Sequence, residues 1–197
     1  MLHDNLGVNE QGHLTIGGVD TLALAEKYGT PLYVMDEDKL RSNCRIYTSA
    51  FAKYMPSGSM PLFASKSLCC KRIYSVIDSE GMGTDLVSPG ELYTASAAGF
   101  ELQKAFFHGN NKTDADIEYA VDSGVGFFII DNREEADKLN SYAASKGIKQ
   151  KALLRLTPGI DPHTHAKIST GKVDSKFGSA IETGQAEAIT AYALKLP

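Results

Sequence analysis

Short runs of apolar and β-branched residues alternate with longer segments of helical periodicity from residue 61 onward. The runs start at residues 61, 84, 105, 127 and 152, so that a new run begins every 21 to 25 residues. Two parallel strands need a crossover connection of a dozen or more residues, usually a helix, and this spacing leaves room for one. The pattern predicts a parallel sheet covered by helices, with strands over 61–64, 84–87, 105–108, 127–130 and 152–156.

Helix-start signals follow the predicted strands. Ser88 can act as an N-cap, with Pro89 at the first helical position and Glu91 where its carboxylate can bond back to the cap. Weaker signals of the same kind occur at 113–116 and 131–134. These positions predict that helices begin soon after the second, third and fourth strands.

A further helix is predicted before the first strand. Asp36 can cap it, and apolar residues then recur at intervals of four and three residues, namely Leu40, Cys44, Tyr47, Phe51 and Tyr54. This spacing places them in one stripe along a helix. We expect the stripe to pack on the outside of the sheet.

Two architectures accommodate five βα units. One is a complete, open, doubly wound sheet, and the other is a (β/α)8 barrel of which only about five-eighths is present. After the fifth strand the sequence predicts a long loop over 157–178 and a helix from about Thr183, and the chain reaches Pro197 where another strand is due. We therefore expect a truncated chain.

Composition and charge narrow the class of protein. The chain has 43% hydrophobic and 22% charged residues, with 18 Gly and 7 Pro, which is typical of a globular protein and excludes collagen, coiled coil and disorder. Lysine and arginine total 20 against 24 acidic residues, and the net charge of -4 gives no overall positive field for a phosphate backbone. Nucleic acid is not expected as a partner.

The sequence also bears on the cellular compartment. Cys44, Cys69 and Cys70 form no CxxC pair and are odd in number, so neither a disulfide framework nor a zinc site is predicted. The longest apolar stretch, 124–130, is far shorter than the roughly 20 residues of a membrane span. The N-terminus lacks the basic and apolar regions of a signal peptide. We expect a cytoplasmic protein without a membrane partner.

Functional residues of parallel α/β folds lie just beyond the carboxyl ends of the strands. Lys66 follows the first predicted strand, where partial desolvation would lower its pKa and free a nucleophilic amine, although a surface or ion-paired lysine is the alternative. Asp85 lies within the second strand, where a carboxylate needs a neighbouring cation or a polar site unless it faces water. The pattern alone leaves both alternatives open.

Further polar residues lie near the same strand ends. The segment 108–112 can bind an anion or simply cap the next helix. His163 and His165 have a spacing that can chelate a metal, but no third ligand is evident, so no metal site is predicted. Arg155 and Lys176 add cationic groups, and arginine suits carboxylate or phosphate recognition, with surface charge as the alternative.

Taken together, these segments resemble the N-terminal half of the diaminopimelate decarboxylases, a family of pyridoxal-phosphate-dependent group IV decarboxylases with an alanine-racemase-like barrel. The matching segments lie at 28–34, 63–66, 83–92, 109–112, 155–161, 164–165, 168–171 and 176–178. The resemblance covers nearly the whole chain. The long loop over 158–178 resembles the diaminopimelate enzymes more than the ornithine ones.

The resemblance implies a fold and a set of site residues. The fold is a partial (β/α)8 barrel over 31–197, preceded by a segment over 1–30 that belongs with a β-domain outside the chain. Lys66 would form the internal aldimine with pyridoxal 5'-phosphate. Asp85 corresponds to the family's carboxylate beside that lysine, Arg155 to a residue on the cofactor side and Lys176 to one on the substrate side. No metal is implied.

The implied activity is decarboxylation of meso-2,6-diaminopimelate to L-lysine, the last step of lysine biosynthesis, by a homodimeric carboxy-lyase. The family's second half carries the histidine stacked on the cofactor ring, the glycine-rich phosphate loops, the acidic residue at the pyridine nitrogen and the β-domain. We therefore expect little or no turnover from the 197-residue chain alone. An open barrel has two unpaired edge strands, so we also expect self-association. Residues before about Pro31 should be loosely held, with apolar positions partly exposed.

Three alternatives remain at this stage. The first is a related decarboxylase of carboxynorspermidine, ornithine or arginine, because Lys66 and the Asp85 segment do not fix the side-chain pocket. The second is a non-enzymatic pyridoxal-phosphate-binding barrel, against which stand the N-terminal extension and the long loop. The third is a complete doubly wound domain unrelated to the cofactor, in which Lys66, Asp85 and the Lys176 loop would match the family by coincidence.

Overall fold

The computed structural model describes residues 3–160 and 177–197, and the chain divides into two compact units. Unit 1 comprises Met1–Pro61 and Ser79–Met82, and unit 2 comprises Leu62–Asp78 and Gly83–Pro197. The division at residue 30 that the resemblance implies stays a prediction. No helix within the described ranges is both long and apolar enough to cross a membrane.

Unit 1 begins with a small antiparallel sheet and a helix. Their bounds are β1 Leu6–Val8, β2 Leu14–Ile16, β3 Val19–Asp20 and α1 Thr21–Tyr28. Asp20 caps α1 by accepting the backbone N–H of Leu22 at 2.8 Å. Val8, Val19 and Leu22 are exposed, which confirms that apolar positions before Pro31 are partly exposed. The sheet itself was not predicted.

The helix predicted before the first strand is α2 (Glu37–Tyr54). The Asp36 carboxylate accepts the backbone N–H of Lys39 at 3.1 Å, so the predicted cap is confirmed. Within the predicted stripe Cys44 is buried, whereas Tyr47 and Tyr54 are exposed. The packing of this stripe on the sheet stays a prediction.

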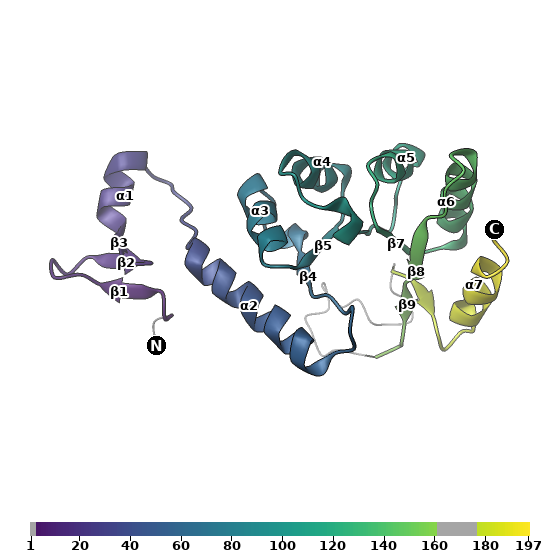
Figure 1. The fold of residues 1–197 in the computed structure, drawn as a ribbon, viewed down its shortest axis with the longest axis horizontal. Coiled ribbons are helices and arrows are strands. Elements are labelled where there is room, and N and C mark those ends of the chain that lie inside the picture. The colour runs from purple at the N-terminus through teal and green to yellow at the C-terminus, as the bar shows by residue number, and fades with distance from the viewer. Residues whose placement is uncertain (1–2, 161–176) are drawn as a thin grey trace. The chain divides into compact units, whose positions relative to one another are not determined.

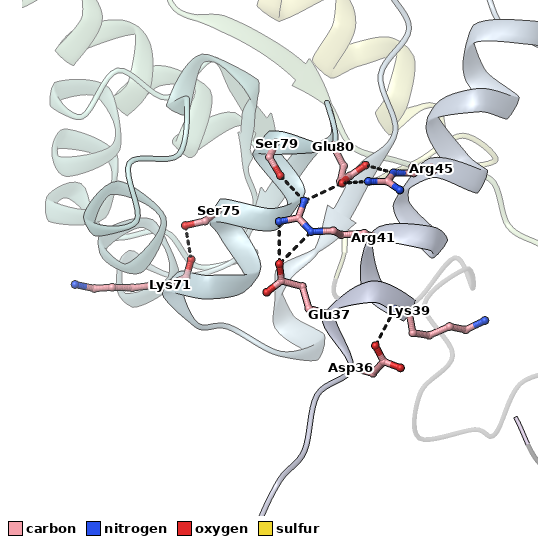
Figure 2. Close-up of polar contacts among 9 residues, drawn as sticks. All are labelled: Asp36, Glu37, Lys39, Arg41, Arg45, Lys71, Ser75, Ser79 and Glu80. Carbon is pink, nitrogen blue, oxygen red and sulfur yellow. Dashed lines mark hydrogen bonds and ion pairs between the residues drawn. The ribbon is translucent and has the colours of Figure 1, made fainter. Parts of the chain in front are cut away.

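Two arginines of α2 bind Glu80 (Figure 2). Arg41 Nη1 lies 2.8 Å from Glu80 Oε1, and Arg45 Nε lies 2.7 Å from Glu80 Oε2. Arg41 also pairs with Glu37 at 2.9 Å. Hydrogen bonds from Arg45, and then from Arg41, hold the pKa of the Glu80 carboxyl below its usual range. This cluster joins the Ser79–Met82 segment to α2 within unit 1.

Unit 2 is built on a five-stranded parallel sheet with the order β4-β5-β6-β7-β8. The strands are β4 Leu62–Ala64, β5 Gly83–Leu86, β6 Ala105–Phe107, β7 Phe127–Ile130 and β8 Lys151–Leu154. The helices between them are α3 Lys71–Ser79, α4 Pro89–Ala97, α5 Asp114–Asp122 and α6 Arg133–Ser145, with the 3-10 turns η1 Ser65–Ser67 and η2 Leu102–Lys104. All five predicted strands are confirmed, with their ends within two residues of the predicted ones.

The strand order decides between the two architectures. Strands that are neighbours in this sheet are also consecutive in the chain. A doubly wound sheet instead reverses its order at a switch point and carries helices on both faces. Figure 1 shows α3, α4, α5 and α6 on one face of the sheet. Sequential strands with all their helices on one side are typical of a (β/α)8 barrel, so the doubly wound alternative is wrong.

The core of unit 2 lies between the sheet and these helices. Phe107 and Phe128 are buried there and meet edge to face, with ring centroids 5.6 Å apart. Because successive side chains of a strand point to opposite faces, Phe106 and Phe127 lie on the other face, where they stack at 4.4 Å and are half-buried. The face opposite α3, α4, α5 and α6 therefore also carries apolar side chains.

The predicted helix starts of unit 2 are confirmed with one correction. Ser88 accepts the N–H of Glu91 at 3.2 Å, and Thr113 forms a complete capping box with Asp116. The Glu91 carboxylate accepts a hydrogen bond from the backbone N–H of Val87 at 2.5 Å. The expected partner was the cap residue Ser88, so this prediction is wrong by one residue. Asn132 caps α6.

The last part of the described chain holds elements that the pattern did not predict. β9 (Leu156–Thr157) and β10 (Ser179–Ala180) form a separate two-stranded parallel sheet. The final helix, α7 (Gln185–Ala193), was expected from about Thr183 and begins two residues later.

Candidate functional site

A row of polar residues follows the carboxyl ends of the parallel strands, and we call it the carboxyl-edge row. Its members are Lys66 after β4, Asp85 within β5, His108 after β6, Asp131 after β7 and Arg155 after β8. Because parallel strands all end at the same edge, the sheet brings these residues to one edge of unit 2. Three of them were singled out from the sequence, whereas His108 was considered only within a polar cluster and Asp131 only within a helix start.

Lys66 is carried by the η1 turn that ends β4. Ser65 before it is fully buried, but Lys66 itself is exposed. Its amine makes no hydrogen bond to any residue in the described ranges. The partial desolvation expected for this lysine is therefore wrong for the described part of the chain, and the amine is accessible to a ligand.

Asp85 holds the turn that carries Lys66. Its Oδ1 accepts the backbone N–H of Ser65 at 3.0 Å, and the Ser65 hydroxyl donates to the Asp85 carbonyl at 2.6 Å. The sequence predicted that this carboxylate needs a cation or a polar site, and its partner is the backbone N–H of Ser65. The two hydrogen bonds fix the geometry of the residue immediately before Lys66.

Arg155 and Asp131 form the other end of the row. Arg155 Nη1 lies 3.5 Å from Asp131 Oδ2, and the guanidinium lies over the Phe177 ring, 4.2 Å from its centroid. The Asp131 side chain is only 3% exposed, and that of Arg155 is 31% exposed. Asp131 Oδ1 is buried without a hydrogen-bond partner in the described part of the chain.

Lys112 stabilises the loop behind the row. Its buried Nζ donates to Glu135 Oε1 at 2.5 Å, to the Gly109 carbonyl at 2.7 Å and to the Ile129 carbonyl at 2.8 Å. An ammonium has three N–H donors, and all three are used. Anion binding by this residue, an alternative for the 108–112 segment, is therefore excluded. Burial raises the pKa of the Glu135 carboxyl, although the Lys112 charge opposes this.

His108 lies between the two ends of the row. Burial lowers the pKa of its imidazole below the usual range, the charge of Asp85 opposes this shift, and those of Arg155 and Lys112 reinforce it. Its ring makes no hydrogen bond to the residues that the structure describes. Burial therefore favours the neutral form of the imidazole.

Other candidates can be placed only in part. Lys176, His163 and His165 lie outside the described residues. The substrate-side role of Lys176 and the absence of a metal role for the two histidines therefore stay predictions. Within the described ranges, no group of three or more His, Cys, Asp or Glu side chains could hold a metal. Cys44, Cys69 and Cys70 are free thiols.

A cavity of about 590 Å³ is lined by residues outside the carboxyl-edge row. It is formed by α6, α7 and β8, and its lining includes Leu139, Ala143, Leu154, Ala193 and Leu196. It shares no residue with the carboxyl-edge row, and its lining carries no ionisable group suited to catalysis beyond Lys149. The row, not this cavity, is the candidate site.

Comparison with known proteins identifies the class of site. The family model described as "Pyridoxal-dependent decarboxylase, pyridoxal binding domain" matches residues 37–196. The described residues fit such a cofactor. Lys66 offers an accessible amine for its aldehyde, Arg155 offers guanidinium donors for its anionic oxygens, and Asp131 has an unused acceptor at the same edge.

Curated relatives match almost the whole chain but only part of their own length. Diaminopimelate decarboxylase of Bacillus methanolicus is 45% identical over 192 residues, which are 98% of this chain and 44% of the relative. The enzyme of the same name from Bacillus subtilis is 42% identical over 186 residues, or 94% of this chain and 42% of the relative. The chain thus spans less than half the length of the relatives it matches.

Solved structures confirm the fold. Diaminopimelate decarboxylase from M. jannaschii in complex with L-lysine matches with a TM-score of 0.87 and 33% identity, covering 98% of this chain and 45% of that one. The sequential parallel sheet is therefore a partial (β/α)8 barrel of the alanine-racemase-like type. The chain belongs to the family of pyridoxal-dependent decarboxylases, whose pyridoxal-binding domain matches its residues 37–196.

Proposed function

We propose that this chain forms part of a decarboxylase that converts meso-2,6-diaminopimelate to L-lysine, with pyridoxal 5'-phosphate attached covalently at Lys66. The observation that carries the proposal is the accessible Lys66 amine at the carboxyl edge, on a turn fixed by Asp85. Relatives named diaminopimelate decarboxylase, 39–45% identical over most of this chain, support the choice of substrate.

Each site residue has a distinct part in this proposal. Asp85 holds the Lys66 turn through Ser65, so that the amine is presented at the edge of the sheet. Arg155 donates hydrogen bonds to the cofactor, and the resemblance assigns Lys176 to the substrate side. When bound, the cofactor accepts the electrons that are released as the α-carboxylate leaves as carbon dioxide.

The longer protein would act as a cytoplasmic homodimer, and the 197-residue chain alone would have little turnover. The chain covers only 44% of its Bacillus methanolicus relative, which supports the need for further residues to complete the site. Three free thiols are compatible with a reducing compartment. The net charge of -4 offers no support for a nucleic-acid partner.

Carbon dioxide release from meso-diaminopimelate tests the proposed function. A longer protein that carries these 197 residues should release carbon dioxide, and its Lys66→Ala variant should not. Lys71→Ala is the matched control, because Lys71 is an exposed lysine only five positions away, at the start of α3. Retained activity in Lys66→Ala would contradict the proposal.

The same assay separates the alternatives. Faster release from carboxynorspermidine, ornithine or arginine would identify a related decarboxylase instead. Cofactor attachment without release from any of these amino acids would identify a non-enzymatic binding protein. Release by the 197-residue chain at the rate of the longer protein would contradict the proposal that the chain alone has little turnover.

A further inference from the structure

Asp131 is a buried carboxylate with an incomplete set of hydrogen bonds. Its Oδ2 lies 3.5 Å from Arg155 Nη1, the long limit for a hydrogen bond, and its Oδ1 has no partner in the described part of the chain. A buried acceptor without a donor costs free energy and calls for an explanation. Stability alone therefore does not explain an aspartate at this position.

The main chain of Asp131 is fixed independently of its side chain. Its N–H donates to Glu135 Oε2 at 3.2 Å, and the N–H of Glu135 donates to Asn132 Oδ1 at 2.9 Å. The other Glu135 oxygen is held by Lys112. Asp131 therefore projects its carboxylate from a rigid turn.

Arg155 is held at its backbone, and its guanidinium has two partners among the described residues. Its N–H donates to the Ile130 carbonyl at 2.9 Å, and its carbonyl accepts the N–H of Ser179 at the same distance. Gly178 allows this approach, because a Cβ there would lie 2.6 Å from the Arg155 carbonyl oxygen. The guanidinium contacts only the Phe177 ring and Asp131 among the described residues. Its other N–H donors remain available to a ligand.

The other carboxylates near the edge have partners other than Arg155. Asp85 Oδ1 accepts from Ser65, and both oxygens of Glu135 are hydrogen-bonded. Within the described ranges, Asp131 is the acidic residue that pairs with Arg155. A carboxylate that contacts one edge of the planar guanidinium leaves the opposite donors free.

We propose that Asp131 is the positioning residue of Arg155: it holds the guanidinium at the carboxyl edge so that its free N–H donors meet an anionic oxygen of the cofactor. The inference rests on the role proposed above for Arg155. This role explains why a carboxylate with an unsatisfied oxygen is present: its negative charge holds the Arg155 guanidinium and leaves some of the guanidinium N–H donors free.

The positioning itself can be tested on the 197-residue chain without any ligand. Nuclear magnetic resonance of the Arg155 Nε–H group should show a restrained side chain in the wild type and a more mobile one in Asp131→Asn. Asp114→Asn is the matched control, since Asp114 forms an exposed ion pair with Lys138 at 2.6 Å. An Arg155 signal that is unchanged in Asp131→Asn would overturn the proposal.

Amide exchange separates positioning from a merely structural role. The backbone N–H of Asp131 bonds to Glu135 and not to its own side chain, so its protection should be the same in Asp131→Asn. Loss of that protection would show that the variant disrupts the turn, and would overturn the proposal. Asp131→Glu, which keeps the charge, should restore part of the restraint on Arg155.

Cofactor attachment tests the consequence for the site. After incubation with pyridoxal phosphate and borohydride reduction, Asp131→Asn should label Lys66 at least about tenfold more slowly, as expected for loss of a hydrogen bond to a charged group. In an Arg155→Met background the same change should have no further effect, and multiplicative losses would overturn the proposal. A mobile guanidinium in Asp131→Asn with wild-type labelling in Arg155→Met would support the positioning and contradict only the cofactor role of Arg155.

Discussion

Lys112 and Glu135 form a buried ion pair, in which each charge compensates the cost of burying the other. Lys112→Met leaves the Glu135 carboxylate buried without its cation, and we expect a loss of about 3–5 kcal/mol in the free energy of unfolding. Urea unfolding followed by circular dichroism measures this loss. The exposed Lys138→Met should change the stability by less than about 1 kcal/mol, because its pair with Asp114 is solvated.

A double variant separates the pair from packing effects. Adding Glu135→Gln to Lys112→Met removes the unpaired charge and keeps an acceptor for the Asp131 N–H. Most of the lost stability should return. A double variant as unstable as Lys112→Met alone would show that the packing of the lysine, not the charge pair, is what matters.

His108 should make the stability depend on pH. Its folded pKa is lowered by burial, so the unfolded chain binds the proton more readily below about pH 6.5. Stability is therefore full above that pH and falls as the pH drops through the folded pKa, by at most about 1.4 kcal/mol per pH unit. Equilibrium unfolding at a series of pH values should show this slope in the wild type and a smaller slope in His108→Asn. An equal change in the exposed His3→Asn variant would refute the assignment.

Single residues of the site were predictable only where their neighbours are unusual. Lys66 stood out because it follows an apolar strand at its carboxyl end, and Asp85 because a charged residue within an apolar strand is costly. Asp131 and His108 follow strands at positions where polar residues commonly begin a loop or helix, so their sequence gave no distinctive signal. Their burial and missing hydrogen bonds arise from long-range packing, which no local pattern records.

At the scale of elements, Gly126 sets the approach of η2 to the start of β7. A Cβ at this position would lie 2.0 Å from the carbonyl oxygen of Gln103, so the backbone must shift. We expect Gly126→Ala to lower the free energy of unfolding by about 1–3 kcal/mol, as overpacking typically does. Gly90→Ala is the control, because Gly90 lies in α4 with its nearest neighbour at 3.9 Å and alanine favours a helix. A neutral Gly126→Ala in the same unfolding assay would contradict the close approach.

The elements that the sequence predicted belong to a repeated pattern or extend over several turns. The five strands were predicted because they recur at a regular spacing, and three helix starts because capping residues follow the second, third and fourth strands. The apolar stripe of α2 extends over several turns. β1, β2, β3, β9 and β10 have only two or three residues each and lie outside the regular repeat of strand and helix, so no pattern indicated them. Their pairing depends on partners that only the folded chain brings together.

At the scale of the whole molecule, the edges of the five-stranded sheet are exposed. β4 and β8 have a strand neighbour on one side only within the described residues, and Leu62 and Leu153 are exposed on them. Unpaired strand edges with apolar side chains favour pairing between chains. The expected self-association of the 197-residue chain has this physical basis, and it stays a prediction.

The central claim is that Lys66 is the lysine to which the cofactor attaches. The most direct test is borohydride reduction of the chain after incubation with pyridoxal phosphate, followed by peptide mass mapping. Selective labelling of Lys66 over the exposed Lys71 is the predicted result, because the η1 turn presents the Lys66 amine at the carboxyl edge. Labelling spread evenly over the lysines, or absent from Lys66, would contradict the claim that the cofactor attaches at Lys66.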